Sequence, residues 1–204
     1  MFCQHQQGKH VIIEQNLYFS PTTDEIIKEL DLRSEPKYCG TKKRIIRLPD
    51  MEPFFVMIPV YIIEGVQTRL LPDFLIPRKH YPAFVIGEIL NSLNPPHKVH
   101  NIQQIEAAHI NTNSTTPVKE TKKNWIQWFD LNYNAFLAAM IILYENTPDK
   151  GSLGWTDQDR LLDIIRLRKP NKWLGAVVSN ALRFKMELQY APWRHISPNP
   201  IYAA

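Results

Sequence analysis

The residues with the clearest chemical potential form a lysine-rich run directly before a group of aromatic side chains. Lys119, Lys122 and Lys123 lie in the sequence VKETKKNWIQWF, in which Trp125 is the first aromatic residue. Ammonium groups bind phosphate oxygens, and a recognition helix presents its polar N-terminal half to the backbone and base edges of DNA. The run therefore predicts a DNA contact in which the three lysines project outward while Trp125 anchors the helix in the core.

Other polar and basic residues extend this predicted DNA-binding surface. A second basic cluster precedes the helical part of the chain, and a third lies on or beside a predicted strand. Each cluster could contact phosphates, although a solvated surface is the commoner fate of such short runs. The predicted DNA-binding residues are Thr116, Lys119, Lys122, Lys123, Asn124, Arg78 and Lys79, and His80, Lys42, Lys43, Arg44 and Arg47 complete the two clusters.

Metal-binding and catalytic motifs are weak. Cys3, His5, His10 and Cys39 lie near the predicted strands, but a structural zinc site normally takes its four ligands as two close pairs, which these spacings do not supply. The chain has no GxGxxG, P-loop, GxSxG or HExxH motif. We expect no metal, no cofactor and no catalytic residue, and we assign no enzymatic activity.

Composition predicts a folded protein outside the membrane. The 204 residues are 44% hydrophobic and 22% charged, with a net charge of +4 that permits a polyanionic partner without requiring one. The longest apolar stretches, 54–63 and 136–144, are about half the roughly 20 residues that a spanning helix needs. The N-terminal sequence MFCQHQQGKH has no apolar segment of signal-peptide type, and two cysteines suit a reducing compartment, so we expect a cytoplasmic protein.

The elements that must position these residues change character along the chain. The front part has β-branched and aromatic segments separated by Pro, Asp and Gly, with Gly65 at an expected turn. From Tyr81 onward the apolar spacing becomes helical. We predict strands over 11–13, 43–48, 54–63 and 66–71 and a short helix over 24–32, followed by helices over 82–93, 102–110, 117–131, 133–144, 157–168 and 172–189.

These elements predict an α+β fold in which a small antiparallel β-ribbon region precedes a mostly α-helical domain. The predicted domains are a β-rich region at 1–76 and a helical domain at 77–191, followed by an irregular tail at 192–204. Three successive short helices within 82–131 form a helix-turn-helix arrangement, although the connection over 110–117 is longer than the tight turn of the simplest such motifs.

One stretch carries a family resemblance. The sequence LLPDFLIPRKHYPAFVIGEIL at 70–90 resembles the junction in bacterial transposase-like, mobile-element-associated proteins, where a small zinc ribbon ends in an LPD phrase and passes into a helix-turn-helix domain. The segment 58–69 looks like the second ribbon hairpin of that family, and 118–129 looks like its recognition helix, with Thr121 and Trp125 at matching positions. The family's second hairpin carries a CxxC pair, which is missing near 62–66. The resemblance thus implies DNA binding with a degenerate, metal-free ribbon.

Three hypotheses about function follow. The first is a DNA-binding protein of transposase-associated or regulatory type that acts through the helix-turn-helix, with DNA as the expected partner. The second is a protein-interaction module or a decayed mobile-element remnant without DNA affinity, which keeps a protein partner or a homo-oligomer open. The third is an enzyme with an acidic site, which predicts several carboxylates in one pocket. A DNA partner predicts that the basic clusters share one surface with the third helix.

Overall fold

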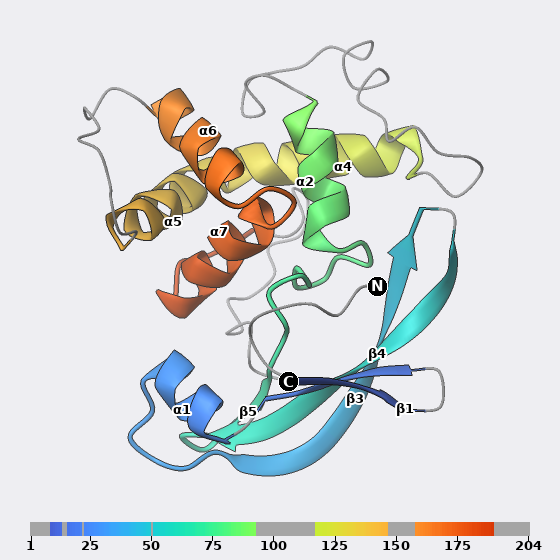
Figure 1. The fold of residues 1–204 in the computed structure, drawn as a ribbon, viewed down its shortest axis with the longest axis vertical. Coiled ribbons are helices and arrows are strands. Elements are labelled where there is room, and N and C mark those ends of the chain that lie inside the picture. Colours follow the sequence, from blue (N-terminus) through green and yellow to red (C-terminus); the bar gives the residue numbers. More distant parts are fainter. Residues whose placement is uncertain are drawn as a thin grey trace.

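The computed structural model describes residues 9–13, 16–21, 23–49, 51–92, 117–146 and 158–189. The helix expected over 102–110 and the tail expected at 192–204 lie outside the described residues, as do Cys3, His5 and Thr116. The fold is α+β, as predicted. Figure 1 shows a curved sheet with a group of helices against it.

The sheet is built around one long hairpin. Its two long strands are β3 (Lys37–Leu48) and β4 (Met51–Ile63), and β5 (Val66–Arg69) folds back against β4. A second hairpin of β1 (Lys9–Ile13) and β2 (Asn16–Ser20) completes five strands. The predicted strands and the turn at Gly65 are confirmed, and Gly65 has a positive φ of 81° that suits glycine.

The pairing of β2 adds one parallel contact to the predicted antiparallel ribbon. β2 lies parallel to β4, with Leu17 opposite Val56 and Tyr18 opposite Met57. β5 pairs with the same edge of β4 further along, from Val60 to Ile63. One edge of β4 is therefore shared by β2 and β5, while β3 takes the other edge.

Six described helices surround this sheet. The first, α1 (Thr23–Leu30), lies between β2 and β3, and the others follow β5. They are α2 (Ala83–Asn91), α4 (Lys119–Leu131), α5 (Tyr133–Glu145), α6 (Gln158–Arg168) and α7 (Trp173–Arg183). A helix was expected at each of these places, after β5 from the apolar spacing, and their presence is confirmed.

The last helix is shorter than predicted. It ends at Arg183 instead of continuing to Gln189. Lys185 adopts a left-handed conformation with φ 54°, and the N–H groups of Lys185 and Met186 donate to the carbonyls of Leu182 and Ala181 at 2.9 Å each. This is the Schellman arrangement that ends a helix and reverses the chain, here without the usual glycine.

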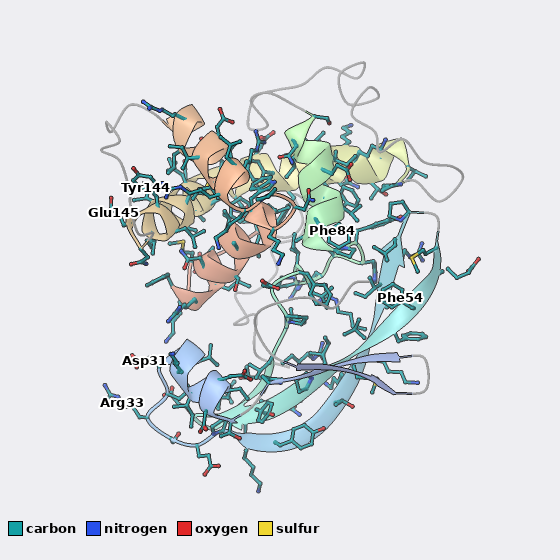
Figure 2. The ribbon with its side chains drawn as sticks, viewed as in Figure 1. Asp31, Arg33, Phe54, Phe84, Tyr144 and Glu145 are labelled. Atoms are coloured by element: carbon teal, nitrogen blue, oxygen red, sulfur yellow. The ribbon has the colours of Figure 1, made fainter. Side chains whose placement is uncertain are left out.

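One hydrophobic core joins the sheet to the helices. Ile46 and Leu48 of β3 and Val56 and Ile58 of β4 are buried in the same cluster as the apolar side chains of α2 and α4–α7. Figure 2 shows Phe54 of β4 and Phe84 of α2 where the sheet meets the helices, and both pack against this cluster. The core therefore crosses the position at which the sequence suggested a domain boundary.

A smaller cluster fixes α1 to the far end of the sheet. Ile26 of α1 is buried with Tyr61 of β4 and with Leu70, which follows β5. Tyr61 lies on the opposite face of β4 from Val56 and Ile58, because successive strand residues alternate between faces. The helical core and α1 thus cover opposite faces of the sheet.

Among the described residues, no single helix is long and apolar enough to cross a membrane. The helices α4 and α5 satisfy length and composition only as a pair, which is bent by 68° where they meet.

Candidate nucleic-acid interface

The lysine run at the start of α4 does not project outward as one group. Lys122 is only 7% exposed, and burial lowers the pKa of its ammonium group. The reason is its place on the helix: Trp125 and Ile126 are three and four residues further on, so all three side chains share the core-facing side. Lys122 therefore packs largely within the protein, and its contact with DNA stays a prediction.

The neighbours of Lys122 point in other directions. Lys123 is exposed, and Asn124 is half-buried, with an Oδ1 atom that has no hydrogen-bond partner among the described residues. The side chain of Lys119 is not described, although its backbone begins the helix. Trp125 is 3% exposed, which confirms that it anchors α4 in the core.

The two other basic clusters lie next to each other, although they are far apart in the sequence. The N–H of Arg47 in β3 donates to the carbonyl of His80 at 2.9 Å. The Arg44 guanidinium, also in β3, donates to the carbonyls of Ile76 and Lys79, the latter at 2.6 Å. The segment 76–80 is therefore fixed to β3 by both backbone and side-chain hydrogen bonds.

Arg44 itself acts within the protein. The bonds to Ile76 and Lys79 satisfy carbonyls of a turn, in which the Lys79 N–H donates to the Ile76 carbonyl at 3.1 Å. Charge-assisted hydrogen bonds of this kind are stronger than neutral ones. Arg44 thus belongs to the support of the segment rather than to its exposed surface.

The same segment contacts α4. The Lys79 ammonium lies 4.8 Å from the centre of the Trp128 ring, and burial lowers the Lys79 pKa to about 8. The next contact is between Tyr81 and Trp125, whose rings meet edge to face with centres 5.0 Å apart. A cation over tryptophan and an edge-to-face pair both favour a fixed geometry.

We call the place where β3, residues 76–81 and α4 meet the cationic junction. Exposed basic side chains at or next to it are Lys42, Arg47, Arg78 and His80, with Lys42 and Arg47 on opposite faces of β3, while Lys79 is half-buried. Arg78 holds a left-handed backbone with φ 61°, which is uncommon for a residue with a Cβ atom.

Close packing behind the junction fixes the backbone that leads into it. A Cβ atom added to Gly175 of α7 would come within 2.4 Å of the Asp73 carbonyl oxygen. The Ala83 N–H at the start of α2 donates to the Phe74 carbonyl at 2.8 Å. The chain entering the junction is thus held by β3 on one side and by α2 and α7 on the other.

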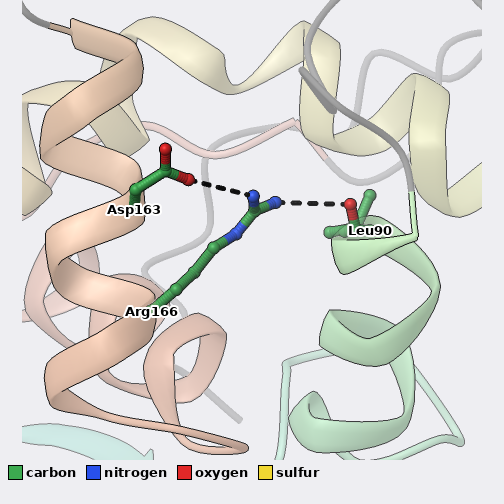
Figure 3. A network of polar contacts seen from close by, with 3 residues as sticks. All are labelled: Leu90, Asp163 and Arg166. Atoms are coloured by element: carbon green, nitrogen blue, oxygen red, sulfur yellow. Dashed lines mark hydrogen bonds and ion pairs between the residues drawn. The ribbon is translucent and has the colours of Figure 1, made fainter.

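Arg166 provides a contrast, because its charge serves the helical core. Its guanidinium donates to the Leu90 carbonyl in the last turn of α2 at 3.3 Å and lies 3.6 Å from the Asp163 carboxylate (Figure 3). Burial lowers the Arg166 pKa, and Asp163 opposes that shift. A cation at the C-terminal end of a helix stabilises the helix dipole, and here Arg166 of α6 lies at the end of α2.

In the described part of the chain, no group of three or more His, Cys, Asp or Glu residues is placed to hold a metal ion. Cys39 is exposed and carries a free thiol. The side chain of His10 is not described.

Comparison of the chain with protein-family models, with curated proteins and with solved structures found no match.

Sequence reasoning named the basic clusters but did not place Lys42, Arg47 and His80 among the binding residues. No local pattern shows that β3 and the segment before α2 are neighbours, because this contact depends on tertiary packing. The burial of Lys122 did have a signal, since Trp125, Ile126 and Phe129 follow it at helical spacing.

Proposed function

We propose that this protein binds DNA and that the cationic junction supplies its phosphate contacts. The observation that carries the proposal is the Arg47–His80 backbone hydrogen bond, which joins two separate basic clusters beside α4. Proteins that bind DNA concentrate Lys and Arg on one surface, because each neutralised phosphate releases condensed counterions. A transposase-associated or regulatory role, as the sequence resemblance implies, goes with this proposal.

The geometry favours contacts with the phosphate backbone over base readout. The cations of the junction come from a strand and from a short segment before α2, so no single helix presents them. Lys122 is buried, which leaves the exposed Lys123 as the described lysine through which α4 reaches DNA. Phosphate contacts position a protein on DNA without selecting sequence. We therefore expect strong dependence on salt and weak dependence on sequence.

A charge-removal variant tests this proposal. Lys42, Arg47 and Arg78 are all exposed, so changing the three to Gln removes three positive charges without opening the core. Titration of a random-sequence duplex at several salt concentrations is expected to show weaker binding, with the slope of log affinity against log salt reduced by about 2 to 3.

The matched control removes three exposed lysines elsewhere, at Lys28, Lys169 and Lys185. Because the net charge falls equally in both variants, a general charge effect would weaken both to the same extent. Equal losses, or an unchanged salt slope in the junction variant, would show that the junction is not the DNA contact.

A further inference from the structure

The sheet has an outward surface beside the junction, and the two surfaces share Arg47. Ile46, Val56 and Ile58 are buried on the side facing the helices, so alternate residues of β3 and β4 point away from them. Phe55 is 41% exposed on this outward side, and its register partner is Ile45. We call this surface the Phe55 platform.

Basic side chains flank the platform. The Lys43 ammonium lies 5.6 Å from the centre of the Phe55 ring, and Lys43 is the register partner of Met57. Arg47 follows two residues after Ile45 and is also exposed. Because alternate residues of a strand are roughly 6.6 Å apart, one cation lies on each side of the Ile45–Phe55 pair.

An exposed aromatic ring between two cations matches the chemistry of a single-stranded nucleic acid. Unpaired bases stack on aromatic side chains without sequence preference, while neighbouring Lys and Arg residues neutralise the flanking phosphates. A duplex cannot use the ring in this way, because its bases are already stacked on one another. The half-buried Ile45 and Met57 provide an apolar floor beside the ring.

We propose that the Phe55 platform binds an unpaired DNA strand by stacking a base on Phe55, with Lys43, which lies over the ring in the free protein, displaced to an adjacent phosphate and Arg47 at the other. This inference rests on the proposed DNA binding and deepens it, since the platform and the junction share β3. A protein with both surfaces holds DNA at a place where duplex and single strand meet.

The test uses the full chain with two probes, a short oligothymidylate and a random-sequence duplex. Phe55→Leu keeps an apolar side chain on the exposed strand position but removes the ring. We expect about a tenfold loss of oligothymidylate affinity and less than about a twofold change for the duplex. Phe184→Leu is the matched control, because Phe184 is 50% exposed at the end of α7, and it is expected to leave both affinities unchanged.

A second measurement reports stacking directly. In Phe55→Trp, stacking of a thymine on the new indole is expected to quench its fluorescence when oligothymidylate is added, whereas Phe184→Trp is expected to show no change.

The outcomes separate this inference from the proposed function. One outcome is duplex binding that depends on the junction and an oligothymidylate affinity that Phe55→Leu leaves unchanged. This result would overturn the platform but keep the proposed function. Equal losses of affinity for both probes in Phe55→Leu would overturn the platform as well, because Phe55 would then support DNA binding in general and not base stacking. Failure to bind either probe removes the proposed function itself.

Discussion

At the residue scale, burial shifts the pKa values of acidic and basic side chains in and beside α4 in opposite directions. Burial raises the Asp130 pKa to about 6, and its Oδ1 atom has no hydrogen-bond partner among the described residues. Burial lowers the pKa values of Lys79 and Lys122. In the acid and in both lysines, burial therefore disfavours the charged form of the side chain. These costs are set by tertiary packing rather than by the helix itself.

Asp130→Asn is expected to stabilise the protein at neutral pH. Because the folded-state pKa of Asp130 lies above its ordinary value of 3.8, the stability present in acid is lost as the pH rises through about 6. After allowance for solvent screening, the variant should exceed the wild type by about 1–2 kcal/mol at pH 7 and match it near pH 4.

Urea denaturation at several pH values measures this difference. Glu120→Gln is the control, since Glu120 is an exposed carboxylate of the same helix, and its effect is expected to stay within about 0.5 kcal/mol at each pH. A constant gap between Asp130→Asn and wild type from pH 4 to pH 7 would contradict the assignment of the shift to Asp130.

The fate of the three lysines shows what sequence spacing conveys about single side chains. Helical spacing correctly placed Trp125 in the core, because an aromatic residue gains more from burial than any neighbour. The same spacing put Lys122 on that face, but its charge suggested the surface. The prediction followed the general rule that lysine is rarely buried. In the structure, the helical spacing determines the position of Lys122 instead.

At the scale of elements, Asn132 connects three parts of the chain. It is 3% exposed between α4 and α5, and its Nδ2 atom donates to the carbonyls of Trp128 and Gln189 at 2.7 Å each. Its Oδ1 atom accepts the Gln189 N–H at 2.6 Å. The side-chain amide therefore pairs with the backbone of Gln189 as a neighbouring strand would.

Asn132→Ala is expected to destabilise the protein by about 2–4 kcal/mol, because three hydrogen bonds are lost and buried polar groups are left without partners. Asn180→Ala is a graded control, since Asn180 makes a hydrogen bond to the Ala139 carbonyl at 2.9 Å and is half-buried. Chemical denaturation should show the smaller loss, about 1 kcal/mol, for Asn180→Ala. Similar small losses in both variants would mean that the Gln189 contact adds no stability.

Local patterns predicted most elements but not their partners. The β-branched runs indicated β3, β4 and β5, and the apolar spacing indicated α2 and the later helices. The strand β2 was missed, although its sequence NLYFS contains two aromatic residues that favour strands. Five residues directly before a helix are too few to show a strand pattern. Its parallel pairing with β4 depends on contacts distant in the sequence, which no local rule contains.

At the scale of the whole molecule, the shared core predicts a single cooperative unfolding transition. Ile58 of β4 is 2% exposed in the cluster that also holds the buried residues of the helices. Ile58→Ala is therefore expected to cost about 2–5 kcal/mol and to shift the loss of helical and tertiary signals together.

Far-ultraviolet circular dichroism and tryptophan fluorescence, followed in one denaturant series, test this coupling. Ile62→Ala is the matched control, because Ile62 lies on the same strand but is 38% exposed. Two separated transitions in Ile58→Ala, with the helical signal unshifted, would show that the sheet and helices unfold as independent units.

The two hydrogen bonds between Asn132 and Gln189 also constrain the order in which the protein folds during synthesis. During synthesis, α4 and α5 leave the ribosome well before Gln189. The Asn132 side-chain amide between these helices is therefore first exposed to water, without its hydrogen bonds to Gln189. The helical half then reaches its final packing only after the stretch beyond α7 has emerged and turned back. A chain that ends before Gln189 is therefore expected to lack two of the three side-chain hydrogen bonds of Asn132.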